Sequence, residues 1–326
     1  MRDRFEREIN YLRISITDRC NLRCRYCMPE DGVEKMEHSS ILNLEEMARL
    51  VNVAAQAGIH KVRLTGGEPL VRRNISQLIR YIAGLSEIDD IGITTNGILF
   101  GAVAEELQQA GLKRVNFSLD SLKSERFRYL TRCGDLEAVK KSIFKAIDLN
   151  MHPVKINTVI IGQFNDDEIL DFADLAYNYP VHIRFIEFMP VGDLRFWKKE
   201  RVVSSEEIKS RIESRYKLIT ARRIAGNGPA KYYQIENGQG SIGFISPMSN
   251  HFCGECNRIR LTADGRLRAC LYDKTEVDLK TPLRNGASDA ELLDLFRKCI
   301  SKKPAHHEMS SGWGIENERK MYQIGG

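Results

Sequence analysis

Six of the eight cysteines in this chain fall into two groups of three, one near each end of the sequence: Cys20, Cys24 and Cys27, then Cys253, Cys256 and Cys270. Structural zinc sites usually close four Cys or His ligands around the metal, and neither group shows an obvious fourth ligand at zinc-finger spacing. A cubane iron–sulfur cluster has four irons, so three thiolates hold it and leave one iron open to bind another molecule. The two triads therefore favour two clusters that each keep an open iron.

The alternatives to clusters differ between the two triads. His251 could complete the second triad as a zinc site, whereas the sequence offers no such candidate for the first. A ferredoxin-type electron carrier would use four thiolates per cluster, and cysteines placed by chance or buried as small hydrophobes compete poorly with the CxxxCxxC spacing of the first triad. Cys133 and Cys299 lie outside both triads, and we expect them to be ordinary buried thiols.

Length and composition favour a large intracellular domain. The chain has 326 residues, of which 42% are hydrophobic, enough for one large α/β domain with an appendage. Its charged beginning has no apolar signal segment, and no run of about 18 apolar residues occurs. We therefore expect a cytoplasmic protein without a membrane-spanning segment. Clustered cysteines in such a protein favour metal binding over disulfides. A net charge of +5, from 49 basic and 44 acidic residues, is too balanced to indicate nucleic-acid binding.

Short β-rich runs alternate with helical stretches over residues 10–190. Asn43, followed three residues later by Glu46, is typical of a capped helix start. Repeated βα units indicate a parallel sheet, and six units are too few for a full eight-stranded barrel. We therefore predict the α/β class, with an incomplete (βα)6 TIM-like barrel over residues 1–192 and an α+β region over 193–326. The predicted strands are Leu12–Thr17, Lys61–Thr65, Ile91–Thr95, Arg114–Leu119, Val154–Ile160 and Val181–Glu187.

Polar or glycine-rich segments follow nearly all of these strands. In barrels of this kind the chemistry gathers at the carboxyl ends of the strands. Each segment alone could be a simple turn, but their joint placement predicts one site at this edge of the sheet. The segments are the first cysteine loop, Gly66-Gly67-Glu68-Pro69, Thr95-Asn96-Gly97, Ser118 with Asp120, and Glu187 with Met189.

Polar side chains also alternate with apolar ones along four of the predicted strands. Because helices cover the outside of such a sheet, the outer face should be apolar and the polar side chains should point inward. Buried cations without partners are costly, so we expect this interior to hold water and an anionic ligand. Lys61 and His182, at the beginnings of strands, could instead reach solvent. The polar set is Arg13, Ser15, Thr17, Lys61, Arg63, Thr65, Lys155, Asn157, His182 and Arg184.

A hairpin explains the long spacing within the second triad. Asp264-Gly265 predicts a tight turn, which would bring Cys256 and Cys270 together around one metal cluster. Arg258 and Arg260 lie two residues apart on the outgoing strand, so both side chains would point the same way. On an ordinary surface hairpin they would be solvated. Beside a cluster site, their planar donors instead suit the oxygens of a phosphate group.

The CNLRCRYC run and the following GGEP segment resemble those of the radical S-adenosylmethionine (SAM) enzymes. The resemblance implies that the first triad holds a [4Fe-4S] cluster whose open iron binds the amino and carboxylate groups of SAM. It also implies the partial barrel that the βα repeats predict. The residues that it assigns to SAM are Tyr26, Gly67, Ser118 and Met189.

The CGxCNRIRLTxDGxLxxC segment is similar to that of the radical SAM enzymes that cyclise GTP in the first step of molybdenum cofactor biosynthesis. This likeness implies that SAM cleavage yields a 5′-deoxyadenosyl radical, which removes the hydrogen from C3′ of GTP. C3′ then bonds to C8, giving (8S)-3′,8-cyclo-7,8-dihydroguanosine 5′-triphosphate, while an auxiliary [4Fe-4S] cluster on the second triad holds the guanine. The implied GTP residues are Arg13, Arg63, Thr94, Lys155, Arg258, Ile259 and Arg260, with Arg184 as a further candidate.

The same likeness implies a functional tail and a set of partners. The terminal Gly325 and Gly326 would reach into the barrel and be needed for activity. GTP and SAM would be the substrates, an electron donor would be required, and the product would pass to cyclic pyranopterin monophosphate synthase. We expect a monomer or homodimer. The alternative is a radical SAM enzyme that modifies a peptide or another small molecule, which would usually carry more cysteines and an acidic or apolar groove.

Overall fold

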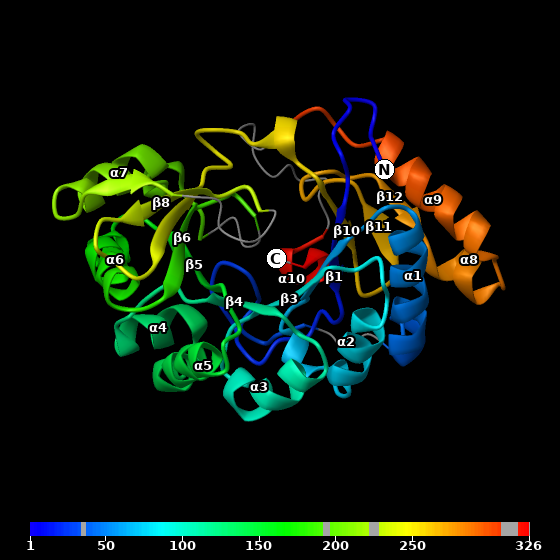
Figure 1. The fold of residues 1–326 in the computed structure, drawn as a ribbon, viewed down its shortest axis with the longest axis horizontal. Helices are drawn as coiled ribbons and strands as arrows, with labels where there is room; N and C mark the ends of the chain where they lie inside the picture. Colours follow the sequence, from blue (N-terminus) through cyan, green and yellow to red (C-terminus); the bar gives the residue numbers. More distant parts are fainter. Residues whose placement is uncertain (34–36, 192–195, 222–227, 308–318, 326) are drawn as a thin grey trace.

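The computed structural model describes residues 1–33, 37–191, 196–221, 228–307 and 319–325. The strands in these ranges form one open sheet that curves around the middle of the molecule, with helices along its outside (Figure 1). The order of the strands is β12-β11-β10-β1-β2-β3-β4-β5-β6-β9-β8-β7.

The six central strands are those that the sequence predicts, with ends that differ by at most two residues. Each pairs in parallel with the next, which confirms the incomplete (βα)6 barrel. These strands are β1 (Tyr11–Ser15), β2 (Lys61–Thr65), β3 (Asp90–Thr95), β4 (Arg114–Ser118), β5 (Val154–Ile160) and β6 (Val181–Glu187).

Helices pack on the outer face of these strands and bury the apolar side chains between them. Leu12 and Ile14 of β1, for example, are fully buried in this core. The predicted capping box at Asn43 and Glu46 is present at the start of α1. No helix of the described residues is long and apolar enough to span a membrane. The helices are α1 (Leu44–Gln56), α2 (Ile75–Ala83), α3 (Phe100–Gln109), α4 (Ser124–Thr131), α5 (Leu136–Asp148) and α6 (Ile169–Asn178).

The C-terminal part of the chain extends the same sheet at both edges. At one edge β9 (Ser241–Ile245) pairs in parallel with β6 and continues to β8 (Lys231–Ile235) and β7 (Leu218–Thr220). At the other edge β10 pairs in parallel with β1 and leads to β11 and β12. The bounds of the remaining elements are β10 (Arg258–Leu261), β11 (Arg266–Arg268), β12 (Glu276–Asp278), α7 (Ser205–Glu213), α8 (Lys280–Arg284), α9 (Asp289–Ser301) and α10 (Met321–Ile324).

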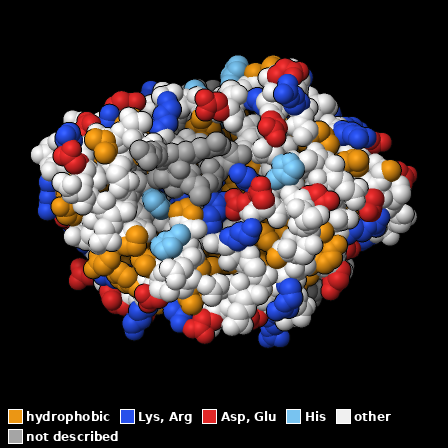
Figure 2. Space-filling view, viewed as in Figure 1, with side chains coloured by type: hydrophobic (Ala, Val, Ile, Leu, Met, Phe, Trp, Pro, Cys, Tyr) orange, Lys and Arg blue, Asp and Glu red, His pale blue; other side chains and the backbone are white. Residues whose placement is uncertain are grey.

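The hairpin predicted at Asp264-Gly265 is confirmed, because β10 and β11 pair antiparallel with Arg260 opposite Arg268. Gly265 has a φ of +81°, a conformation that favours glycine. On the face drawn in Figure 2, acidic and basic side chains are interspersed, as the balanced composition of the chain predicts.

Candidate active site

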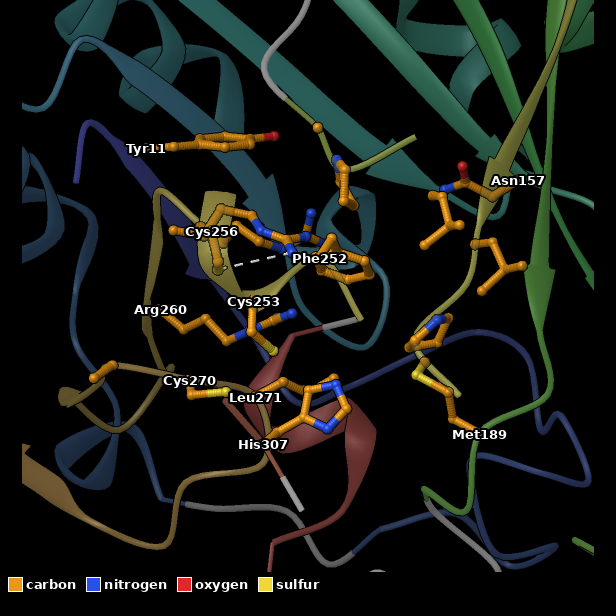
Figure 3. Close-up of a pocket in the computed structure, with 18 of the residues that line it drawn as sticks. Tyr11, Asn157, Met189, Phe252, Cys253, Cys256, Arg260, Cys270, Leu271 and His307 are labelled. Carbon is orange, nitrogen blue, oxygen red and sulfur yellow. Dashed lines mark hydrogen bonds between the residues drawn. The ribbon is translucent and has the colours of Figure 1, made fainter. Parts of the chain in front are cut away.

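Two adjoining cavities lie inside the curve of the sheet, each lined by one cysteine triad. The first-triad cavity has a volume of about 240 Å³ and is lined by Cys20, Cys24 and Cys27. The second-triad cavity has a volume of about 190 Å³ and is lined by Cys253, Cys256 and Cys270. The residues common to both linings are Asn157, Ile186, Met189 and Met321. In Figure 3 the second triad and Arg260 lie across the second-triad cavity from Asn157 and Met189.

The GGEP segment packs directly against the first cysteine loop. A Cβ on Gly66 would lie 2.4 Å from the main-chain oxygen of Thr17, and a Cβ on Gly67 would lie 2.4 Å from that of Arg19. Only glycine permits this approach of two backbones. The pair of glycines therefore holds the edge of the first-triad cavity close to the cysteine loop.

Glu68 of the same segment is buried and locks the next strand end in place. Its carboxylate accepts hydrogen bonds from the Thr95 hydroxyl at 2.8 Å and from the Asn96 main-chain N–H at 2.7 Å. Burial raises the pKa of Glu68 to about 7, against the lowering effect of these donors. The GGEP and TNG segments, which the sequence places at successive strand ends, are thus joined through one carboxyl group.

All four residues that the resemblance assigns to SAM line the first-triad cavity: Tyr26, Gly67, Ser118 and Met189. The Tyr26 hydroxyl donates to Asp120 at 2.7 Å, and the other carboxylate oxygen of Asp120 accepts from the Val159 N–H at 2.8 Å. Burial raises the pKa of Asp120 to about 6. Asp120 therefore fixes the tyrosine ring beside the triad.

Burial favours the protonated form of the first-triad thiols in the absence of a metal. Burial raises the pKa of Cys20 to about 11 and that of Cys27 to about 12, and it also raises the pKa of Cys24. The other thiols raise the pKa of Cys24 further. Because these thiols lose their protons only beside positive charge, the irons of a cluster would be their natural partner.

The spacing of the triads does not fit a single zinc ion. With Zn–S bonds of about 2.3 Å, tetrahedral ligands would place neighbouring sulfurs roughly 3.8 Å apart. Among the described residues, the one group of three such ligand atoms that all lie within 4.8 Å of one another is His251, Cys253 and His307. That group leaves out Cys256 and Cys270, so His251 does not close the second triad.

Cations surround the second triad. The Arg258 guanidinium donates to the Cys256 sulfur at 3.9 Å, and Lys303 also lines the cavity. Burial would raise the pKa of Cys256, but the charges of Arg258 and Lys303 outweigh it and lower that pKa to about 6. Cys256 therefore favours the thiolate even before a metal binds, whereas burial raises the pKa of Cys253.

The sheet aligns three arginines in one row inside the barrel. Arg13 of β1 is the register partner of Arg260 on one side and of Arg63 on the other. The row continues to Gly92 of β3, where a Cβ would lie 2.3 Å from the Arg63 Nη1 atom. Gly92 therefore provides the space in which the Arg63 guanidinium lies. Arg63 Nε donates to the Tyr11 hydroxyl at 3.0 Å.

The crowded cations alter the ionisation of their neighbours. Burial lowers the pKa of Arg13 to about 10, and the nearby Arg258 and Arg63 lower it further against the opposing effect of Tyr11. Burial also lowers the pKa of Lys155 to about 6, with a contribution from Arg184. For Tyr11, the charges of Arg63 and Arg13 outweigh burial and lower the pKa to about 7. An anionic ligand would relieve this repulsion.

Three buried side-chain oxygens have no hydrogen-bond partner within the described part of the chain: Thr94 Oγ1, Asn116 Oδ1 and Asn157 Oδ1. All three residues line the cavities. Buried polar atoms in folded proteins are nearly always paired. These oxygens therefore point to polar ligands in both cavities.

Comparison with known proteins identifies the family. Residues 14–176 match the model of the radical SAM superfamily, and residues 181–309 match that of Molybdenum Cofactor Synthesis C. The GTP 3′,8-cyclase of Syntrophomonas wolfei is 67% identical over all 326 residues, and that of Moorella thermoacetica is 55% identical, with each alignment covering 100% of both chains. The chain belongs to the GTP 3′,8-cyclase family.

Solved structures support the fold of this cyclase family member. The structure of Streptococcus suis SuiB bound to S-adenosylmethionine has a TM-score of 0.64 and 15% identity, and covers 89% of this chain. Methylornithine synthase PylB has a TM-score of 0.51 and 18% identity over 63% of this chain. The aligned parts span 65% and 62% of those two chains. At such low identity the likeness concerns the fold alone.

The residues expected to bind GTP divide into four groups by position. Arg13, Arg184, Arg258 and Arg260 line the second-triad cavity. Arg63 and Lys155 are buried and lie outside that lining, and Arg63 reaches it through its hydrogen bond to Tyr11. Thr94 lines the first-triad cavity instead, because the end of β3 faces the GGEP segment. The Ile259 side chain lies in the hydrophobic core, opposite the two flanking arginines on β10, so only its main chain could face a ligand.

The tail enters the barrel in this member of the cyclase family. The Gly325 oxygen accepts a hydrogen bond from the Arg260 guanidinium, and α10 lies inside the curve of the sheet (Figure 1). A Cβ on Gly325 would lie 2.5 Å from the Thr65 hydroxyl oxygen. Met321 lines both cavities and Tyr322 lines the first. Gly326 lies outside the described residues.

Glu187, expected at the edge of the site, has a structural role. Its buried carboxylate accepts main-chain hydrogen bonds from Ser205 at 3.1 Å, Met248 at 2.9 Å and Ser249 at 3.0 Å. It thereby joins the end of β6 to the C-terminal part of the chain.

Sequence reasoning missed three residues that line the second-triad cavity: Tyr11, Asn116 and Lys303. Tyr11 lies two residues before Arg13, so the alternation of side chains along β1 could have found it. The alternation of side chains along β4 could have found Asn116 in the same way. Lys303 follows a helix in a basic segment and carries no local pattern that distinguishes it from its neighbours.

Proposed function

We propose that the first-triad cavity binds SAM, that the second-triad cavity binds GTP, and that the two substrates meet at the residues shared by both linings. As a member of its family, the chain converts GTP to (8S)-3′,8-cyclo-7,8-dihydroguanosine 5′-triphosphate, the first step of molybdenum cofactor biosynthesis. Its cofactors are two [4Fe-4S] clusters and SAM. The observation that carries the proposal is the pair of adjoining cavities, each with three cysteines.

In this proposal the first-triad cavity positions SAM for cleavage. Cys20, Cys24 and Cys27 hold the cluster, which when bound supplies the electron that cleaves SAM. The backbone of Gly67, the Ser118 hydroxyl and Met189 contact SAM, and Asp120 keeps the Tyr26 ring against it. We also assign Thr94 to SAM instead of GTP, because its unpaired hydroxyl lies in this cavity.

The second-triad cavity would bind the triphosphate and the base of GTP. Cys253, Cys256 and Cys270 hold the auxiliary cluster, which binds the guanine. Arg13, Arg258 and Arg260 are placed to donate to phosphate oxygens, since guanidinium groups bind them in pairs of hydrogen bonds. Arg184 lines the same cavity, and Arg63 and Lys155 add charge from behind it. The Ile259 main chain is the remaining contact on β10.

Much of the catalytic task of the chain is positioning. A primary carbon radical reacts with whatever it touches, so C3′ of GTP must lie beside C5′ of the adenosyl group. Asn157, Ile186, Met189 and Met321 line both cavities and would lie where the two substrates meet. Apolar Ile186 and Met189 keep water away, while Asn157 offers an unpaired oxygen to a ribose hydroxyl.

Further parts of the proposal concern partners and organisation. A separate donor supplies electrons, and the product passes to cyclic pyranopterin monophosphate synthase. The enzyme acts in the cytoplasm as a monomer or homodimer. Residues 1–192 form the unit that binds SAM, and residues 193–326 supply the auxiliary cluster and the tail, although the two units share one sheet.

Single-cysteine variants test the division of labour between the triads. We expect Cys24→Ser to abolish SAM cleavage while GTP still binds. Cys256→Ser should retain some uncoupled SAM cleavage but form no cyclised nucleotide. Cys133 is exposed, so the expectation of a buried thiol is wrong there, whereas Cys299 is buried as expected. Cys133→Ser, which removes this exposed thiol near the first triad, serves as the matched control and should behave as the parent. The readouts are iron content, methionine and 5′-deoxyadenosine release, and cyclised GTP. Intact SAM cleavage in Cys24→Ser would show the first assignment to be wrong.

A further inference from the structure

Lys303 is a buried lysine beside the second triad. It follows α9, is 2% exposed and lines the second-triad cavity. Its ammonium group donates to the main-chain oxygen of Arg258 at 2.8 Å and to that of Ala269 at 2.6 Å. Arg258 comes two residues after Cys256, and Ala269 directly precedes Cys270. The lysine therefore joins the two chain segments that carry these cysteines at the open end of the β10–β11 hairpin.

A second buried cation, Arg7, fixes the backbone next to Lys303. Its guanidinium donates to the main-chain oxygens of Cys253 at 2.7 Å, Pro304 at 2.7 Å and Ala305 at 3.1 Å. Arg7 has a buried carboxylate partner, Asp3, at 2.7 Å. Its charge is therefore balanced locally. Arg7 therefore joins Cys253, the remaining cysteine of the triad, to the segment that follows Lys303.

Among the described residues Lys303 has no such carboxylate partner, and its ammonium group donates to the two carbonyl oxygens instead. A buried charge needs an opposite charge nearby. The cysteines of the second triad line the same cavity as Lys303, and as thiolates they would supply that opposite charge. Among the described residues, no lysine or arginine lines the first-triad cavity. The two triads thus differ in the charge built around them.

We propose that Lys303 is a positioning residue for the auxiliary cluster, which holds the Cys256 and Cys270 segments together and stabilises the reduced form of the cluster with its charge. Reduction adds one electron to the cluster, and a fixed cation beside it favours the more negative state. This inference rests on the proposed assignment of Cys253, Cys256 and Cys270 to that cluster.

The test uses the full chain with Cys20, Cys24 and Cys27 all replaced by alanine, so that only the second triad can hold iron. In this background Lys303→Met is compared with Lys303→Arg, which keeps the charge, and with Lys302→Met, which removes the exposed neighbouring lysine. Iron per chain is measured, and the midpoint potential is obtained by a dithionite titration followed by electron paramagnetic resonance.

At a fixed solution potential, we expect Lys303→Met to reduce the ratio of reduced to oxidised cluster at least tenfold. For a one-electron couple, a tenfold change corresponds to a shift of the midpoint potential by about 59 mV to more negative values. Lys303→Arg and Lys302→Met should keep the potential of the background. If Lys303→Met loses its iron, Lys303→Gln, which keeps N–H donors without the charge, should bind iron and show the same shift.

Two outcomes would contradict the inference and can be told apart. If Lys303→Met binds iron and its midpoint potential is unchanged, the role of Lys303 is overturned and the auxiliary cluster assignment stands. Where Lys303→Met loses its iron, the same result in Lys303→Gln has the same meaning. A background protein that binds no iron would overturn the assignment of the second triad, and with it the inference about Lys303.

Discussion

Arg13 and Arg260 are register partners on neighbouring parallel strands, although they come from opposite ends of the chain. Burial lowers the pKa of both guanidinium groups, and the charge of Arg13 lowers the pKa of Arg260 further. Two buried cations side by side repel each other until an anion lies between them. The pair therefore joins the two ends of the chain in one sheet and forms a cationic site that an anion would stabilise.

The first prediction concerns the triphosphate. Arg260→Ala should weaken GTP binding by about 1.5–3 kcal/mol, or about one to two decades in Kd, because hydrogen bonds to charged groups contribute on this scale. Anaerobic calorimetry measures the change. Arg297→Ala, on the exposed side of α9, is the control and should leave the affinity unaltered. Guanosine should bind the parent poorly and be insensitive to Arg260→Ala; equal affinity for guanosine and GTP would contradict this prediction.

The second prediction tests the space that Gly92 leaves for Arg63. Gly92→Ala should weaken GTP binding about as much as Arg63→Ala, because the new Cβ would occupy the position of the guanidinium. In the double variant the two effects should not add, since both act on the same group. Alanine is otherwise tolerated at a strand position. Additive losses in a double-mutant cycle of GTP affinity would refute a shared cause.

The third prediction concerns pH. Burial and Arg184 lower the pKa of Lys155 to about 6, so this lysine is largely neutral at pH 8 without ligand. Phosphate groups favour its charged form, so GTP binding should take up a proton, and affinity should fall as pH rises above 6. Calorimetry in buffers of different ionisation enthalpy counts the protons. Lys155→Met should take up about one proton fewer at pH 8, and an unchanged count would rule out this linkage.

The same group affects stability with a defined sign. Because its folded pKa lies below the unfolded value of 10.5, the unfolded chain binds more protons between about pH 6 and 10.5. The contribution of Lys155 to the free energy of unfolding therefore increases with pH across this window. Comparing denaturant unfolding of the parent and Lys155→Met should show a steeper rise for the parent.

The fourth prediction separates backbone strain from a steric role of the tail. Gly325 and Gly286 both have a φ of +84°, but a Cβ would contact Thr65 at Gly325 and nothing within 4 Å at Gly286. Gly325→Ala should displace the tail and stop cyclisation while iron content and GTP affinity stay nearly unchanged. Gly286→Ala imposes similar backbone strain and should remain active. Deleting Gly325 and Gly326 should match Gly325→Ala, and normal turnover of either would show that the tail has no role.

The sequence by itself determined the local elements and the residues that carry chemistry. Six βα units, the capped start of α1 and the hairpin at Asp264-Gly265 were predictable because hydrophobic periodicity, capping residues and turn residues act within a few positions. The cysteine spacing and the GGEP segment likewise fixed the kind of site. Alternation along the strands predicted the inward arginines, because side chains of a strand point to opposite faces in turn.

Only the tertiary structure decided which of these residues meet. The pairing of β10 with β1, the shared wall of the two cavities and the position of Thr94 beside the first triad all join segments far apart in the chain. Such contacts depend on how a whole sheet closes around its core, and no local pattern encodes that. Lys303 shows the reason most clearly. Its neighbour Lys302 has the same side chain, and only the packing after α9 buries one of the two beside the cysteines.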